Sequence, residues 1–101
     1  MNYSHMTAKV LYRAAEIVEQ GPWVQYSGLV IDGTETEVCA LGALQRAAHE
    51  LRWSYAPARA VFLFAHRAES VSLLNDEPGR TQTEVADALR AAASLSERSD
   101  A

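Results

Sequence analysis

The clearest fold signal in the chain is the stretch TQTEVADALRAA, residues 81–92. Thr81 and Glu84 have the spacing of a capping box, in which each side chain bonds the backbone of the other residue at the start of a helix. The apolar residues that follow recur at helical spacing on one face: Val85, Ala88, Leu89 and Ala92. The stretch therefore predicts an amphipathic helix with one buried face.

A helix is also predicted over residues 8–20, with Thr7 as its cap. Its apolar residues share one face: Val10, Leu11, Ala14, Ile17 and Val18. Gly21 and Pro22 end this helix, because glycine tolerates a left-handed conformation and proline blocks continuation.

A second helix is predicted over residues 36–52. It starts at a capping box of Thr34 with Glu37, or at Thr36 as the alternative cap. Gly42 lies inside this helix, where glycine costs up to about 1 kcal/mol relative to alanine. Tight packing against a neighbour such as Trp23 would explain that cost.

The segment between these two helices has strand character over residues 23–31. Asp32-Gly33 is a turn signal, and the partner strand would lie in residues 34–38. We expect a short loop or a two-stranded hairpin here.

A third helix is predicted over residues 57–68, with Pro57 as its first residue. Together, the predicted helices indicate a mainly α, compact four-helix domain over residues 7–94. Residues 1–6 are expected to be disordered or vector-derived, and residues 95–101 to be frayed.

The composition of the chain argues against some classes of function. The net charge is −4, the hydrophobic fraction is 49% and there is one cysteine. The arginines have acids close by in sequence and form no dense basic patch, so nucleic-acid binding is disfavoured. The longest apolar run, Ala60–Ala65, is too short to span a membrane. With no secretory signal and no disulfide framework, we expect a cytoplasmic protein.

Cys39 is the candidate nucleophile, because it lies near the predicted start of a helix, where the pKa of a thiol falls. His49 would be its base, Asn75 or Asp76 would orient the base, and Gln25 would offer an oxyanion donor. That set would mimic a cysteine hydrolase.

A structural role for Cys39 is nevertheless the favoured interpretation. The carboxylates of Glu35 and Glu37 oppose thiolate formation, and cysteine is among the most buried residue types when it has no chemical role. His49 and His66 have no second ligand at metal spacing. We therefore expect neither a metal nor a cofactor, and a non-enzymatic role is favoured over an enzymatic one.

Two polar segments are candidate binding sites. Trp23, Gln25 and Tyr26 follow the first helix as an aromatic and polar group, which suits a recognition surface; alternatively, Trp23 folds back into the core.

The second candidate is the polar loop formed by residues 75–80, in which Asn75, Asp76 and Arg80 would bind a ligand. Alternatively, Asn75 or Asp76 caps a short helical turn that Ser70 begins, and Arg80 pairs with Asp76 or Glu84.

Four strings span most of the chain from residue 11 onward: LYRAA (11–15), GPWVQ (21–25), VCALGAL (38–44) and NDEPGRT (75–81). Together, and chiefly through C-A-L-G-A-L and N-D-x-P-G-R-T, they resemble a family of small uncharacterised proteins of actinobacteria and their phages. This chain departs from the family pattern at Pro22 and Leu74. The resemblance implies no activity, and it marks as motif residues Trp23, Gln25, Cys39, Asn75, Asp76 and Arg80.

Two functions remain open. The first is a non-enzymatic protein-interaction module, a phage or accessory protein acting on a host or sister protein. The broad apolar face around Val61–Phe64 would then leave a patch for a protein partner or for self-association. The alternative is a thiol-dependent hydrolase or transferase that uses Cys39, His49 and Asn75 or Asp76.

Overall fold

Five helices account for most of the residues that our computed structural model describes, 3–26 and 37–98. They are α1 (Tyr3–Gln20), α2 (Ala40–Glu50), α3 (Ala56–His66), α4 (Val71–Asp76) and α5 (Gln82–Arg98). The chain is mainly helical, as predicted, but the expected count of four is wrong. The fifth helix is α4, where we expected only a helical turn after Ser70.

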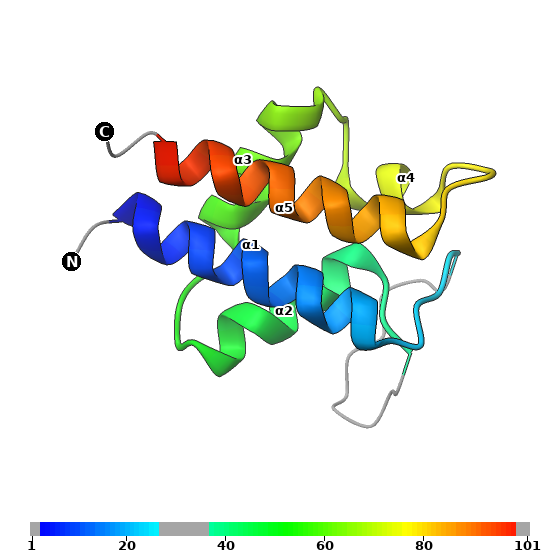
Figure 1. Cartoon of the computed structure of the whole chain (residues 1–101), viewed down its shortest axis with the longest axis horizontal. Coiled ribbons are helices and arrows are strands. Elements are labelled where there is room, and N and C mark those ends of the chain that lie inside the picture. Colours follow the sequence, from blue (N-terminus) through cyan, green and yellow to red (C-terminus); the bar gives the residue numbers. More distant parts are fainter. Residues whose placement is uncertain (1–2, 27–36, 99–101) are drawn as a thin grey trace.

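The centre of the fold is the antiparallel pair α1 and α5, which lie side by side (Figure 1). At one end of the pair the Ser96 hydroxyl donates to the Ser4 carbonyl over 2.8 Å, and at the other Gln82 Nε2 donates to the Val18 carbonyl over 2.6 Å. The buried faces of both helices are rich in alanine, which lets the two backbones approach closely: Ala8, Ala14, Ala15, Ala86, Ala92 and Ala93.

The other long helices cover this pair. α2 packs on α1, and α3 packs mainly on α5, while the short α4 contacts both α2 and α3. The largest core side chains come from four different helices and are fully buried: Leu11, Leu44, Phe62 and Leu89. One apolar core therefore joins helices from both ends of the sequence.

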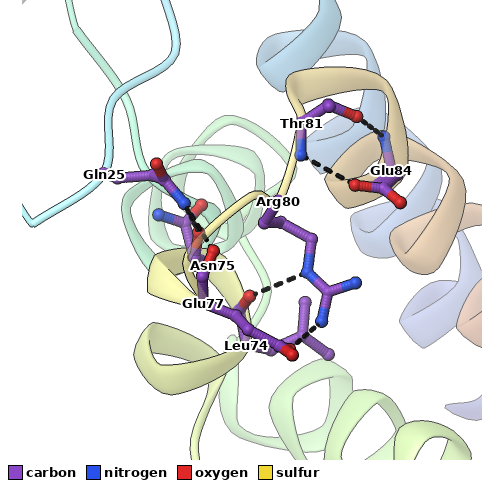
Figure 2. A network of polar contacts seen from close by, with 7 residues as sticks. All are labelled: Gln25, Leu74, Asn75, Glu77, Arg80, Thr81 and Glu84. Carbon is purple, nitrogen blue, oxygen red and sulfur yellow. Dashed lines mark hydrogen bonds and ion pairs between the residues drawn. The ribbon is translucent and has the colours of Figure 1, made fainter.

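Two of the predicted caps are confirmed. The Ser70 hydroxyl accepts the Leu73 amide over 2.9 Å and starts α4. The Thr81 hydroxyl accepts the Glu84 amide over 3.1 Å, and Glu84 Oε1 accepts the Thr81 amide over 2.8 Å (Figure 2). This capping box begins α5 as predicted.

The outer helix ends differ from the prediction. α1 begins at Tyr3, four residues before Thr7, and Thr7 is buried within it instead of capping it. α5 continues to Arg98 and buries Ser96, where fraying was expected. The bond between Ser96 and Ser4 explains both extensions, because it joins the two helix ends to each other.

The segment between α1 and α2 is described only at its two flanks. Gly21 ends α1 with φ +38°, as predicted. Trp23 and Val38 then form an isolated parallel bridge, with the Val24 amide on the Val38 carbonyl and the Val38 amide on the Pro22 carbonyl, both at 2.9 Å. The expected turn at residues 32–33 and the caps at 34 and 36 lie outside the described residues.

α2 begins later than predicted, at Ala40, and its cap is Cys39. The expected reason for Gly42 is also wrong. Among the described residues, a Cβ added at Gly42 would meet Cys39 Sγ at 3.7 Å, an ordinary van der Waals contact, and neither Trp23 nor another helix lies close enough to require glycine there. Within the described residues, none of the helices combines the length and apolarity needed to cross a bilayer.

Candidate functional site

The motif residues far apart in sequence meet around the end of α4. We call the group the Asn75 cluster; its members are Trp23, Gln25, Tyr26, Asn75, Asp76 and Arg80, which are the residues predicted to bind a ligand. Asn75 and Asp76 are the last two residues of α4, Arg80 follows in the turn to α5, and the other three come from the segment after α1. The structure therefore brings the two predicted binding segments together.

Asn75 is the centre of the cluster and is fully buried. Its Oδ1 accepts the Trp23 indole N–H over 2.7 Å and the Ala40 amide over 2.9 Å. Its Nδ2 donates to the Val24 carbonyl over 3.0 Å and to Asp76 Oδ1 over 2.9 Å. A side-chain amide has two acceptor lone pairs and two N–H donors, so these four bonds use the whole hydrogen-bonding capacity of Asn75.

Gln25 and Tyr26 fasten the segment after α1 to the end of α4. Gln25 Nε2 donates to the carbonyls of Asn75 and Glu77, each over 3.0 Å (Figure 2 shows the bond to Asn75). The Tyr26 amide donates to Asp76 Oδ1 over 2.9 Å, while the Tyr26 side chain is 64% exposed. The backbone of this segment is therefore fixed, and the ring of Tyr26 faces solvent.

Arg80 holds the turn that follows α4. Its Nε donates to the Leu74 carbonyl over 3.1 Å, and its terminal nitrogen forms an ion pair with Glu77 (Figure 2). The sequence-based expectation that Arg80 pairs with Asp76 or Glu84 is wrong. Both of those carboxylates already bond to backbone or amide groups, Asp76 to Asn75 and Glu84 to Thr81.

The catalytic set built on Cys39 is not assembled. Cys39 is the partly exposed cap of α2, and its Sγ accepts the Gly42 amide over 3.4 Å. His49 lies in the last turn of the same helix. Eleven helical residues rise about 16 Å, so the thiol and the imidazole lie at opposite ends of α2. Asn75 lies near the thiol end of α2, but its side chain is already fully bonded.

The other histidine considered, His66, also has a structural contact. Its Nε2 is 2.7 Å from the Ala88 carbonyl, and its ring lies 4.9 Å from the ring of Phe62. Across residues 3–26 and 37–98, no three metal-binding side chains of His, Cys, Asp or Glu gather at one place.

Charge pairs tie helices together outside the cluster. Arg13 Nε bonds Glu50 Oε2 over 2.7 Å and joins α1 to α2, and the hydrogen bond from Arg13 lowers the pKa of Glu50. Arg90 pairs with Glu19 and joins α5 to α1. A hydrogen bond with Glu97 raises the pKa of the Tyr12 hydroxyl.

The family of the chain follows from a match over nearly its whole length. Residues 3–95 match the model of a family of unknown function, DUF6197. The chain belongs to DUF6197. The DUF6197 match begins in α1 and ends in α5, so it contains every member of the Asn75 cluster. No curated protein and no solved structure matches the chain.

Two groups that bond Asn75 lie outside the set of residues singled out from the sequence, the Val24 carbonyl and the Ala40 amide. Both are backbone groups, and no side-chain pattern marks them. The one available signal was the proximity of both groups to motif residues, Val24 to Trp23 and Ala40 to Cys39.

Proposed function

We propose that this DUF6197 protein is a non-enzymatic protein-interaction module. The observation that carries the proposal is the exposure of Phe64 on α3. Its side chain is 78% exposed, whereas Phe62, two residues earlier, is fully buried in the core. A phenylalanine that is part of a helix and is mostly exposed to water is the kind of anchor that protein interfaces use.

A second apolar side chain supports this interpretation. Leu73 on α4 is 59% exposed, and α4 packs against α3. Scattered surface leucines need no explanation by themselves. Phe64 and Leu73 nevertheless come from two contacting helices, as a contact surface for a partner would require.

The Asn75 cluster also supports a non-enzymatic role, because its polar groups are already used in bonds within the protein. The side-chain amide of Asn75, the indole N–H of Trp23 and one oxygen of Asp76 all bond inside the protein. These groups position the segment after α1 on α4, and the polar motif is best understood as architecture. The thiol-dependent alternative has less support, because Cys39 and His49 occupy opposite ends of α2.

We further propose that the module works in the cytoplasm and acts on a host or sister protein. The single cysteine suits a reducing compartment. The resemblance to small actinobacterial and phage proteins favours an accessory role.

Site-specific photo-crosslinking tests the proposal. A benzophenone amino acid replaces Phe64 in one variant and the exposed Glu16 of α1 in a matched control, and both are irradiated in cells. We expect a discrete adduct from position 64 that is absent from position 16. The mass of the adduct shows whether the partner is a second copy of this 11.1-kDa chain or a different protein. No adduct at 64, or the same adducts from both positions, would contradict the proposal.

A Phe64→Ser variant controls for folding. Because the side chain is mostly in water, its free energy of unfolding should change by no more than about 0.5 kcal/mol. Loss of the partner in pull-downs by this folded variant would place the contact at Phe64.

A further inference from the structure

A second surface of the molecule, remote in sequence from the Asn75 cluster, has the features of a small-ligand site. An open depression of about 750 Å³ lies where α2 ends and α3 begins. That volume falls within the range of small-molecule sites. Its lining residues combine basic, aromatic and small side chains: Ala48, His49, Arg52, Trp53, Ser54 and Pro57.

The charge of this region is opposite to that of the rest of the chain. Residues 44–68 contain four of the nine basic residues but only one of the thirteen acidic residues, Glu50. That one carboxylate is paired with Arg13 from α1. The depression is therefore formed by a stretch of sequence with a net charge of +3 (four basic residues minus one acidic) in a chain whose net charge is −4, and none of its named lining residues is acidic, which favours an anionic ligand.

Arg52 occupies a backbone position that arginine seldom takes. It follows the cap of α2 with φ +55°, in the left-handed region that glycine and asparagine prefer. The Arg52 amide bonds the His49 carbonyl over 3.2 Å, and the Trp53 amide bonds the Ala48 carbonyl over 2.9 Å. This is a Schellman motif, and it fixes the backbone of Arg52 and Trp53, which both line the depression.

We propose that the depression binds a small organic anion in which a flat ring carries a phosphate or carboxylate group. The guanidinium of Arg52 would take the anionic group by paired N–H bonds, as arginine does with phosphates and carboxylates. The indole of Trp53 and the ring of Pro57 provide the apolar wall on which the ligand's ring stacks. This site goes beyond the protein contact at Phe64, and either proposal can fail without the other.

Arg67 provides a matched control. It has φ +49° after α3 and the same type of Schellman bonds, but it does not line the depression. Arg52→Asn and Arg67→Asn therefore remove the same charge from the same backbone conformation. Asparagine tolerates that conformation, so both variants should fold.

The experiment is an NMR titration at constant ionic strength. The chain has two tryptophans, so two indole N–H signals report on it, and Trp23 is the internal reference because it lies outside the depression. The probes are adenosine monophosphate, whose ring system carries a phosphate group, and phenylacetate, whose ring carries a carboxylate group. The controls are adenosine, which lacks the anionic group, and inorganic phosphate, which lacks the ring.

We expect a saturable shift of the Trp53 signal with at least one of the two ring-bearing anions, and weaker binding of both controls. Arg52→Asn should weaken that binding about tenfold or more, and Arg67→Asn should leave it unchanged. No shift with either ring-bearing anion would overturn the proposal. So would equal binding of inorganic phosphate, or equal effects of the two asparagine variants.

Discussion

At the scale of single residues, Asn75 determines how three segments meet. Its amide bonds Trp23 and Val24 after α1, Ala40 at the start of α2, and its own neighbour in α4. All of these bonds are made without exposure of Asn75 to water. Buried polar groups that lose their partners cost far more than the bonds contribute when intact.

Asn75→Ala should therefore lower the free energy of unfolding by about 3 kcal/mol or more, because it leaves the Trp23 N–H, the Ala40 amide and the Val24 carbonyl without a partner. Gln25→Ala should cost only about 1 kcal/mol, because Gln25 is partly exposed and water can replace its bonds. Urea unfolding of the three proteins measures the difference. Equal losses in the two variants would show that Asn75 is not the centre of the cluster.

Substitution by alanine should change the stability of the protein in opposite directions at Gly21, which ends α1, and at Gly42, which lies inside α2. At Gly21, with φ +38°, a Cβ would lie 2.6 Å from Gln82 Nε2, which holds the Val18 carbonyl. Gly21→Ala should cost about 1–3 kcal/mol. Gly42→Ala should stabilise the protein by about 0.5–1 kcal/mol through helix propensity. Thermal unfolding tests both, and a destabilised Gly42→Ala would mean that a close neighbour requires the glycine.

At the scale of elements, the helix starts show what sequence can and cannot predict. The caps made by Ser70 and by Thr81 with Glu84 were predicted because every partner lies within three residues. The start of α2 was placed too early. Its Ala40 amide is satisfied by Asn75, which is 35 residues away, and local pattern rules contain no such information.

Substitutions at Cys39 test its role as the cap of α2. Serine is a strong helix cap, so Cys39→Ser should match or exceed the stability of the wild type, whereas Cys39→Ala should lose about 0.5–2 kcal/mol. Urea denaturation of the wild type and both variants gives the comparison. A serine variant as unstable as the alanine variant would argue against capping by this side chain.

The ion pair that joins α1 to α2 should give a small, pH-dependent contribution. The hydrogen bond from Arg13 holds the pKa of Glu50 below its ordinary value of 4.5. The stabilisation is therefore complete above pH 4.5 and is lost as the pH falls through the lowered pKa. Both side chains are about a third exposed or more, 34% for Arg13 and 40% for Glu50, so the pair contributes less than about 1 kcal/mol.

Glu50→Gln should therefore be slightly less stable than the wild type at pH 7, and the gap should close as the pH falls below 4.5. Unfolding curves across this pH range, with the exposed Glu69→Gln as the control, provide the measurement. A gap that persists unchanged at low pH would assign the effect to something other than the charge of Glu50.

At the scale of the whole molecule, the sequence predicted the helical class and the apolar helix faces that form the core. It also singled out the residues that the structure gathers in the Asn75 cluster. It did not predict how those residues pair. The bonds between Trp23 and Asn75, and between Tyr26 and Asp76, span about 50 residues, as their positions show. They depend on α1 and α5 packing antiparallel, which places the end of α1 beside the turn before α5. Single-segment periodicity carries no information on such placement.

We infer that the motif side chains serve the architecture of the molecule, with Asn75 at the centre of their hydrogen bonds. Hydrogen exchange of the Trp23 indole N–H tests this claim most directly, because that proton is donated to the buried Oδ1 of Asn75. In the wild type we predict protection that approaches the free energy of global unfolding, and in Asn75→Ala a large loss of it. If this indole proton exchanged in the wild type as fast as that of free tryptophan, Asn75 would not hold Trp23 in the buried cluster.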